Sequence, residues 1–182
     1  MKNFFKVFAA LLVLAAFSNT AMAQVSVSGN VAGAELVKVL TVAKTTPLHF
    51  GVLGITSGTA GTVTMSTSGV RTPSNLATTI INTGTPKTVA LFSLTGTSNA
   101  VYTIGLPSTI DVTTGIGTGN YATTIGTLMV KVDAATEATA VAATGTLTAG
   151  VSSFLMSGTL AIGAAQELGV YTGTYNLTVD YQ

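Results

Sequence analysis

Alternation of apolar and polar residues is clearest at the C-terminal end of the chain. From Tyr171 to Tyr181 the odd positions carry Tyr, Gly, Tyr, Leu, Val and Tyr, whereas the even positions carry Thr, Asn or Asp. A β-strand sends successive side chains to opposite faces. The pattern therefore predicts a strand over 173–181 with one buried and one solvated face.

Short runs of the same kind continue through the rest of the chain, separated by Gly, Pro, Asn and Ser. They predict strands over 25–32, 36–43, 48–52, 61–66, 77–82, 89–95, 101–106, 127–132, 144–149, 153–162 and 173–181. The alanine-rich stretch 133–143 is predicted as a loop, because Thr136 and Thr139 interrupt its helical composition. Many short strands with turn residues between them are typical of an all-β, immunoglobulin-like β-sandwich of mostly antiparallel strands.

One face of each strand should be dry, because two stacked sheets bury the sides that face each other. The side chains expected in the core are Phe50, Phe92, Leu94, Ile104, Leu128, Val130, Leu160, Ile162, Leu177 and Val179.

The polar positions carry hydroxyl groups rather than charges, with 34 threonines and 13 serines in 182 residues. Threonine is β-branched and favours strands. Nine Gly-Thr pairs recur at intervals from 3 to 23 residues. A threonine-rich solenoid requires a fixed repeat length, so these pairs predict turns in which glycine supplies a positive φ. A neutral hydroxyl surface favours an extracellular structural protein over a cytosolic enzyme.

The first 23 residues have the organisation of a bacterial secretory signal peptide. Lys2 and Lys6 precede an apolar run over 7–17 and supply the positively charged end. Ala21-Met22-Ala23 forms a small-x-small cleavage pattern. The run is shorter than the roughly 20 residues of a spanning helix, so we expect no transmembrane segment in the mature chain. A retained N-terminal anchor is the alternative. The expected product is one β-sandwich domain over 24–182, exported through the inner membrane to the cell surface, the medium or the periplasm.

Charge and cysteine content argue against a nucleic-acid-binding protein and against a disulfide-stabilised domain. Without the signal peptide, five basic and six acidic residues remain. No basic cluster is present to neutralise phosphates, so we expect no nucleic-acid partner. The chain has no cysteine, and an exported domain of this kind relies on packing and hydrogen bonds rather than on disulfides.

Residues that could carry out catalysis or bind a cofactor are few. His49 is the only histidine, and we expect it to face solvent between Leu48 and Phe50 on a strand. No Gly-x-Ser-x-Gly motif is present, and the acidic residues are scattered. With no thiolate and no second imidazole, a zinc site is not expected. We therefore predict no catalytic, cofactor-binding or metal-binding residue and no enzymatic activity.

The C-terminal segment resembles that of bacterial chaperone–usher pilins, in which a glycine lies fourteen residues from the end and a tyrosine is next to last. Gly169 and Tyr181 occupy these positions. The chain is also similar to an uncharacterised family of secreted bacterial all-β domains that resemble fimbrial subunits. This similarity rests on the ordered motifs Leu48-x-Phe50-Gly51, Gly61-Thr-Val63, Ala90-x-Phe92-x-Leu94-x-Gly96, Leu106-Pro107, Gly158-x-Leu160-x-Ile162-Gly163 and the alternating segment 169–181. The absence of cysteine departs from most pilins, which carry one disulfide.

The resemblance implies a non-enzymatic extracellular structural protein, a pilin-like or fimbrial subunit or an adhesin. In such fibres an N-terminal strand leaves its own domain and completes the sheet of the next subunit. The candidate donor strand is 24–33, in which Val25, Val27, Gly29 and Val31 alternate with polar residues. The implied partners are identical or related subunits, which exchange strands, and a periplasmic chaperone. No cofactor is implied.

Two alternatives stay open at this point. In one, residues 25–32 form the first strand of a complete domain and pair within the chain. In the other, the protein is a stand-alone secreted or surface-attached β-sandwich that binds a ligand. Whether the donor is the chain's own strand or a neighbour's, we expect residues 173–181 to line the groove that it fills.

Overall fold

The computed structural model of the protein describes residues 29, 31, 33–56, 58–75, 78–116, 119–139 and 142–182. The chain divides into two compact units, Met1–Leu36 and Val37–Gln182. The described residues of the first unit are all exposed and form no strand. The predicted strand 25–32 is therefore not formed at Gly29 and Val31, since neither has a neighbouring strand to pair with. The signal peptide, Val25 and Val27 lie outside the described residues.

The second unit is all-β with antiparallel pairing, which confirms the predicted fold class. Its strands are β1 (Thr41–Thr46), β2 (Val52–Ile55), β3 (Gly61–Met65), β4 (Arg71–Pro73), β5 (Thr78–Ile81), β6 (Ala90–Thr95), β7 (Val101–Gly105), β8 (Ile110–Thr113), β9 (Ala122–Val132), β10 (Ala138–Thr139), β11 (Ala142–Thr146), β12 (Val151–Ile162) and β13 (Thr178–Tyr181). A 3₁₀ turn, η1 (Gly119–Tyr121), precedes β9.

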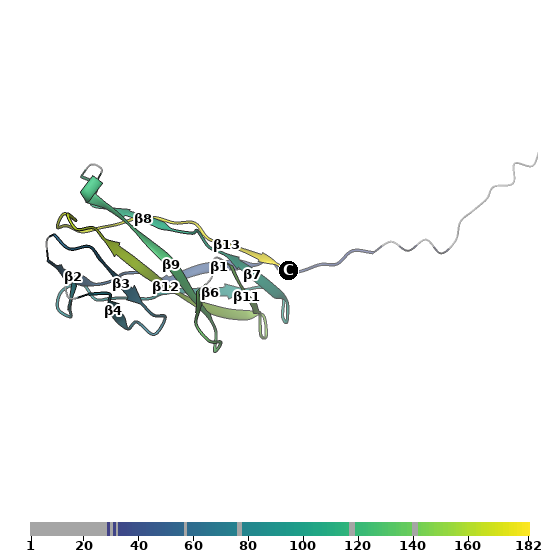
Figure 1. Ribbon diagram of the computed structural model, residues 1–182. Helices are drawn as coiled ribbons and strands as arrows, with labels where there is room; N and C mark the ends of the chain where they lie inside the picture. The colour runs from purple at the N-terminus through teal and green to yellow at the C-terminus, as the bar shows by residue number, and fades with distance from the viewer. Residues whose placement is uncertain are drawn as a thin grey trace, which may run out of the picture. The chain divides into compact units, whose positions relative to one another are not determined.

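The larger sheet is built around β12, a strand of 12 residues. β6 and β3 pair with successive halves of one edge of β12, and β9 pairs with its other edge. β1 lies beyond β6, β4 lies beyond β3, and both β8 and β10 pair with β9. Figure 1 shows β12 in the middle of this arrangement. A second sheet has the order β11-β7-β13, and β2 and β5 form a separate two-stranded ribbon.

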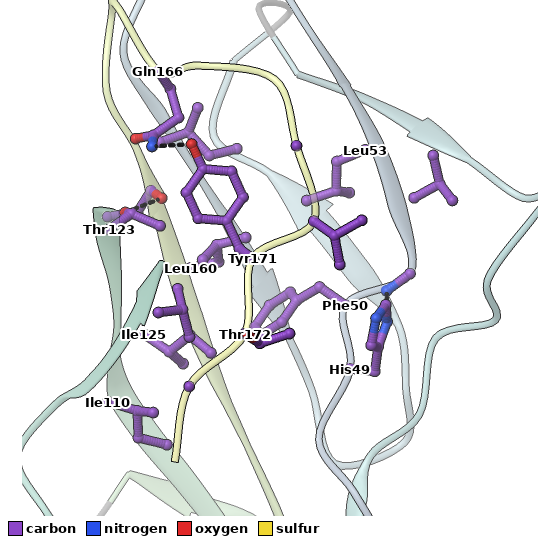
Figure 2. A pocket seen from close by; sticks show the side chains of 18 of the residues that line it. His49, Phe50, Leu53, Ile110, Thr123, Ile125, Leu160, Gln166, Tyr171 and Thr172 are labelled. Atoms are coloured by element: carbon purple, nitrogen blue, oxygen red, sulfur yellow. Dashed lines mark hydrogen bonds between the residues drawn. The ribbon is translucent and has the colours of Figure 1, made fainter. Parts of the chain in front are cut away.

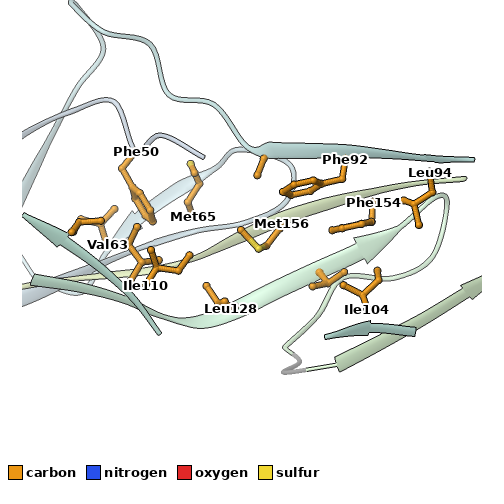
Figure 3. Packing of buried hydrophobic residues seen from close by; sticks show 14 of the residues in the cluster. Phe50, Val63, Met65, Phe92, Leu94, Ile104, Ile110, Leu128, Phe154 and Met156 are labelled. Atoms are coloured by element: carbon orange, nitrogen blue, oxygen red, sulfur yellow. The ribbon is translucent and has the colours of Figure 1, made fainter. Parts of the chain in front are cut away.

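One apolar core joins the two larger sheets in a sandwich-like arrangement (Figure 3). Ile104 of β7 is fully buried and belongs to the same cluster as Phe92 of β6 and Phe154 of β12. The two phenylalanines are directly paired in the ladder, and their rings stack with centroids 4.8 Å apart. Such cross-strand aromatic pairs stabilise a sheet beyond the area they bury.

Strand alternation predicted the core well, because seven of the ten expected residues are buried: Phe50, Phe92, Leu94, Ile104, Leu128, Val130 and Ile162. Leu160, Leu177 and Val179 are half-buried and pack against this core.

Several strand boundaries differ from the prediction. β1 begins at Thr41 rather than at residue 36, because the preceding chain is held by Lys38, whose main-chain N donates to Thr97 Oγ1 at 2.8 Å, and not by a ladder. β9 begins at Ala122 rather than at 127, because its first residues pair with β8.

Three strands were not predicted. β4 and β10 contain three and two residues, which is too short for an alternating pattern to be recognised. β8 has four residues that do alternate, Ile110 and Val112 being buried, and the sequence analysis missed this pattern. β10 also lies within the stretch 133–143 that was predicted as a loop.

Candidate functional site

A pocket with largely apolar walls and a volume of about 430 Å³ lies beside the C-terminal segment, at the far end of β12 from β1. One wall comes from residues 48–55 and the floor from β8, β9 and the last residues of β12. Residues 166–173 and Tyr175 form the remaining wall. Figure 2 shows Phe50 and Leu53 on one side of the C-terminal segment and Ile125 and Leu160 on the other. We call this site the apolar pocket.

A tight turn at Gly51 brings the first wall into place. Gly51 has φ +75°, a conformation that glycine adopts without strain. Its N–H donates to His49 Nδ1 at 2.8 Å, and the main chain of His49 bridges to Thr88 through two hydrogen bonds of 2.8 Å. The expectation that His49 faces solvent on a strand is wrong, since the turn makes it half-buried and places it in the pocket wall. The same turn delays β2 to Val52, against a predicted strand over 48–52.

Arg71 of β4 joins this wall to the β2–β5 ribbon. Its Nη1 donates to the Phe50 carbonyl oxygen at 2.7 Å, and its Nη2 donates to Asn82 Oδ1 at 2.8 Å. Longer contacts of 3.3 and 3.4 Å reach the carbonyl oxygens of Val52 and Ile81. A two-stranded ribbon is marginally stable by itself, so these bonds to neutral acceptors help to hold it at the pocket.

The C-terminal wall is fixed to the larger sheet at two places. Thr172 bridges to Thr113 of β8 through two main-chain hydrogen bonds of 2.9 Å. One residue later, a Cβ atom on Gly173 would lie 2.0 Å from the Asp111 carbonyl oxygen. Only a residue without a side chain allows this approach, which explains a glycine within an otherwise alternating segment.

The other attachment is a small polar cluster around the Tyr171 hydroxyl. Gln166 Nε2 donates to this hydroxyl and to the Asn120 carbonyl oxygen, both at 2.6 Å. The hydroxyl in turn donates to the Glu167 carbonyl oxygen at 2.7 Å. Figure 2 shows the bond between Gln166 and Tyr171 at the pocket wall.

Beyond these attachments, the main chain from 173 to 177 pairs with no described strand. The predicted strand 173–181 is therefore correct only for β13, residues 178–181. The predicted facing is wrong at Gly173, which is exposed, and correct after it, because Tyr175 and Leu177 are half-buried whereas Thr174 and Asn176 are exposed. This segment has the side-chain alternation of a strand but pairs with no neighbouring strand among the described residues.

Tyr175 adds a polar group to the apolar pocket. Its hydroxyl oxygen is buried and has no hydrogen-bond partner among the described residues. Burial raises the pKa of Tyr175 above its ordinary value of 10.0, so the hydroxyl keeps its proton at neutral pH. Because this hydroxyl oxygen is enclosed by protein, the pocket offers mainly apolar surface to a ligand.

The structure does not bring together the residues singled out from the sequence. Gly169 lies in the wall of the apolar pocket. Tyr181 lies away from it, where its hydroxyl donates to the Lys38 carbonyl oxygen and accepts from Thr97 N, each at 2.7 Å. Val31 is 96% exposed. Sequence reasoning missed Tyr175 and Gln166 as pocket residues, although the alternation placed Tyr175 on the buried face.

The described residues offer neither a metal site nor a membrane-spanning helix. Within the described ranges, no three His, Cys, Asp or Glu side chains gather closely enough to hold a metal ion. The described part of the chain contains no helix long and apolar enough to cross a membrane.

Comparison with known proteins gives a family. No curated protein matches the chain significantly. A family model described as a domain of unknown function (DUF4402) matches residues 40–181, which include all thirteen strands and the apolar pocket. Because this match covers well over half of the 182 residues, the chain belongs to the DUF4402 family.

Proposed function

We propose that the protein is a non-enzymatic structural subunit of a bacterial surface fibre, a pilin-like subunit or adhesin that is exported and assembles by strand exchange. One observation carries the proposal: Gly173 and Tyr175 line the apolar pocket, and they belong to a segment, 173–177, whose main chain pairs with no described strand. Such an edge accepts an added strand, because main-chain hydrogen bonds supply affinity and neighbouring pockets select the side chains.

A second copy of the chain can supply the strand. Residues 25–31 carry Val, Val, Gly and Val at alternate positions. Val31 and Leu36 are 96% and 95% exposed. Burying an apolar side chain of this size contributes about 1.5–3 kcal/mol, so insertion of this segment into an apolar site is favourable. A periplasmic chaperone would cover the same site before assembly.

The direction of assembly follows from β12. Val151 at its start pairs with Thr95, which pairs with Thr41 at the start of β1, whereas Leu160 and Ile162 near its end line the pocket. Twelve residues at roughly 3.3 Å each span about 36 Å. A strand that precedes β1 and enters a neighbour's pocket therefore joins the β1 end of one subunit to the pocket end of the next. Such head-to-tail contacts generate an open fibre when the rotation between successive subunits does not close into a ring.

A stand-alone binding domain is the second candidate, and the size of the pocket favours it. A volume of about 430 Å³ falls within the range of small-molecule sites, about 300–1,000 Å³. In that case an apolar ligand fills the pocket and the protein stays monomeric.

The two functions are separated by Val170→Asp. Val170 lines the pocket but is 76% exposed, so a carboxylate there changes the pocket wall without entering the core. Val70→Asp is the matched control, because Val70 is 59% exposed in the turn between β3 and β4. We expect both variants to fold, and only Val170→Asp to lower the amount of sedimenting polymer, by about tenfold. Equal assembly of the two variants would contradict a role for the pocket in assembly, and a monomeric wild-type chain would favour the stand-alone domain.

A further inference from the structure

Just before β1, the fold holds a short stretch of chain in place and leaves its apolar side chains exposed. Val37 and Val39 are 55% and 76% exposed. Between them, the main chain of Lys38 is fixed on both sides of its Cα atom: its N–H donates to Thr97 Oγ1 at 2.8 Å, and its carbonyl oxygen accepts from the Tyr181 hydroxyl at 2.7 Å. The Lys38 side chain is exposed and makes no ion pair or hydrogen bond with any described residue. We call these three residues the strip.

The C-terminal wall of the apolar pocket has a matching composition at residues 167–170, which we call the rim. Leu168 and Val170 line the pocket and are 82% and 76% exposed. Glu167 lines the same wall, and its exposed carboxylate has no bonded partner within the described part of the chain. The rim therefore offers two apolar side chains and one negative charge, whereas the strip offers two apolar side chains and one positive charge.

The strip and the rim cannot meet within one subunit. The strip precedes β1, which lies near the start of β12, whereas the rim belongs to the pocket at the other end of β12, about 36 Å away. A neighbouring subunit can bring them together. Only four residues separate Gly33, the last residue of the proposed donor strand, from Val37, so these two lie at most about 14 Å apart. When the donor strand fills a neighbour's pocket, the strip must therefore lie close to that pocket.

We propose that the strip of one subunit packs against the rim of the next, and that Lys38 forms an ion pair with Glu167 of the second copy. This assignment rests on the proposed function and adds a second contact to it. Opposite charges on facing surfaces select the partner and its orientation more than they add affinity. Lys38 and Glu167 therefore help to determine which end of one subunit meets which end of the next.

Charge reversal in the exported chain, residues 24–182, tests this pairing. Either Lys38→Glu or Glu167→Lys places like charges opposite each other, so at low salt we expect the chain concentration that gives half-maximal sedimenting polymer to rise about fivefold. The double variant Lys38→Glu/Glu167→Lys restores opposite charges and should lie within about twofold of the parent. In about 1 M NaCl, where the Debye length is about 3 Å, the differences should disappear.

Lys44→Glu is the matched control, because Lys44 is exposed on β1 and its reversal changes the net charge by the same amount as Lys38→Glu. We expect it to assemble within about twofold of the parent. All four variants should keep the urea midpoint of the parent, since the three side chains are exposed.

Three results would overturn the assignment. Equal assembly of Lys38→Glu and Lys44→Glu at low salt refutes the ion pair alone and leaves strand exchange intact. A double variant that assembles no better than the single variants means that the two side chains do not face each other. If the parent chain forms no polymer, the proposed function fails and the assignment fails with it.

Discussion

Side-chain hydrogen bonds link the two larger sheets near the start of β12. The Tyr102 hydroxyl of β7 lies 2.7 Å from Ser152 Oγ of β12. Ser152 Oγ donates to Asp133 Oδ2 at 2.6 Å, so Tyr102 donates to Ser152. Asp133 Oδ1 also accepts from Ser153 N at 2.7 Å. In a chain without cysteine, this network is a polar link across the sandwich.

Tyr102→Phe tests this link. The ring stays in the core while one hydrogen bond from a buried hydroxyl is lost, and Ser152 remains bonded to Asp133. We expect the free energy of unfolding to fall by about 1 kcal/mol, measured as a lower urea midpoint at unchanged slope. Tyr121→Phe is the control and should change stability by less than about 0.5 kcal/mol. Equal midpoints for the two variants would show that the Tyr102 hydroxyl contributes nothing.

Tyrosine ionisation should also limit stability at high pH. Burial raises the pKa of Tyr102 and of Tyr175 above 10.0. The unfolded chain therefore loses these protons at a lower pH than the folded chain does, and stability is complete below about pH 10 and falls above it. Urea unfolding between about pH 8 and 11.5 should show this decrease, and the double variant Tyr102→Phe/Tyr175→Phe should show a smaller one. A decrease of the same size in the double variant would rule out these two residues as its cause.

At the scale of elements, the C-terminal segment shows that alternation predicts which side chains are buried but does not predict which strands pair. Apart from Gly173, which is exposed, the half-buried and exposed positions of 171–181 follow the sequence, because facing depends on local chain geometry. The main-chain pairing of this segment does not follow from its sequence, because pairing depends on neighbouring strands that lie far away in the sequence. β8, which bridges to Thr172, has only four residues and was not predicted.

Gly173→Ala tests how closely this segment must approach β8. Its Cβ atom would lie 2.0 Å from the main-chain oxygen of Asp111, so the segment has to shift. We expect a loss of about 1–3 kcal/mol in the free energy of unfolding, measured in urea. Gly33→Ala is the control, since nothing lies within 4 Å of the added atom. Equal stability of the two variants would mean that the contact with β8 yields at no cost.

The edge strand β1 differs from the pocket edge. Its pairing with β6 shifts register between Lys44 and Thr46, and the side chain of Lys44 is exposed. Bulges and charged side chains, lysine in particular, protect edge strands from pairing with other chains. The sheet edge at β1 is thus protected, which supports the pocket as the site of strand addition.

At the scale of the whole molecule, the sequence was enough for the all-β class and for most of the core. The apolar pocket was not predictable in the same way. Residues 110–113, 122–125 and 160–162 come together through the pairing of β9 with β8 and β12, and the bridge of Thr172 to Thr113 adds the C-terminal wall. Residues 48–55 are held by the bridge of His49 to Thr88 and by the pairing of β2 with β5. The free hydroxyl of Tyr175 has no sequence signal, because it is defined by the absence of a partner in the folded domain.

The central claim is that a strand of one subunit fills the apolar pocket of the next. The most direct measurement is analytical ultracentrifugation of residues 24–182 and of residues 34–182, the shortened chain being studied with a synthetic peptide of residues 24–33 or with the chaperone that the proposal requires. The account predicts polymers from the complete chain and a folded, strictly monomeric shortened chain when the peptide or the chaperone holds its pocket. A shortened chain that folds alone and still forms polymers would contradict the account.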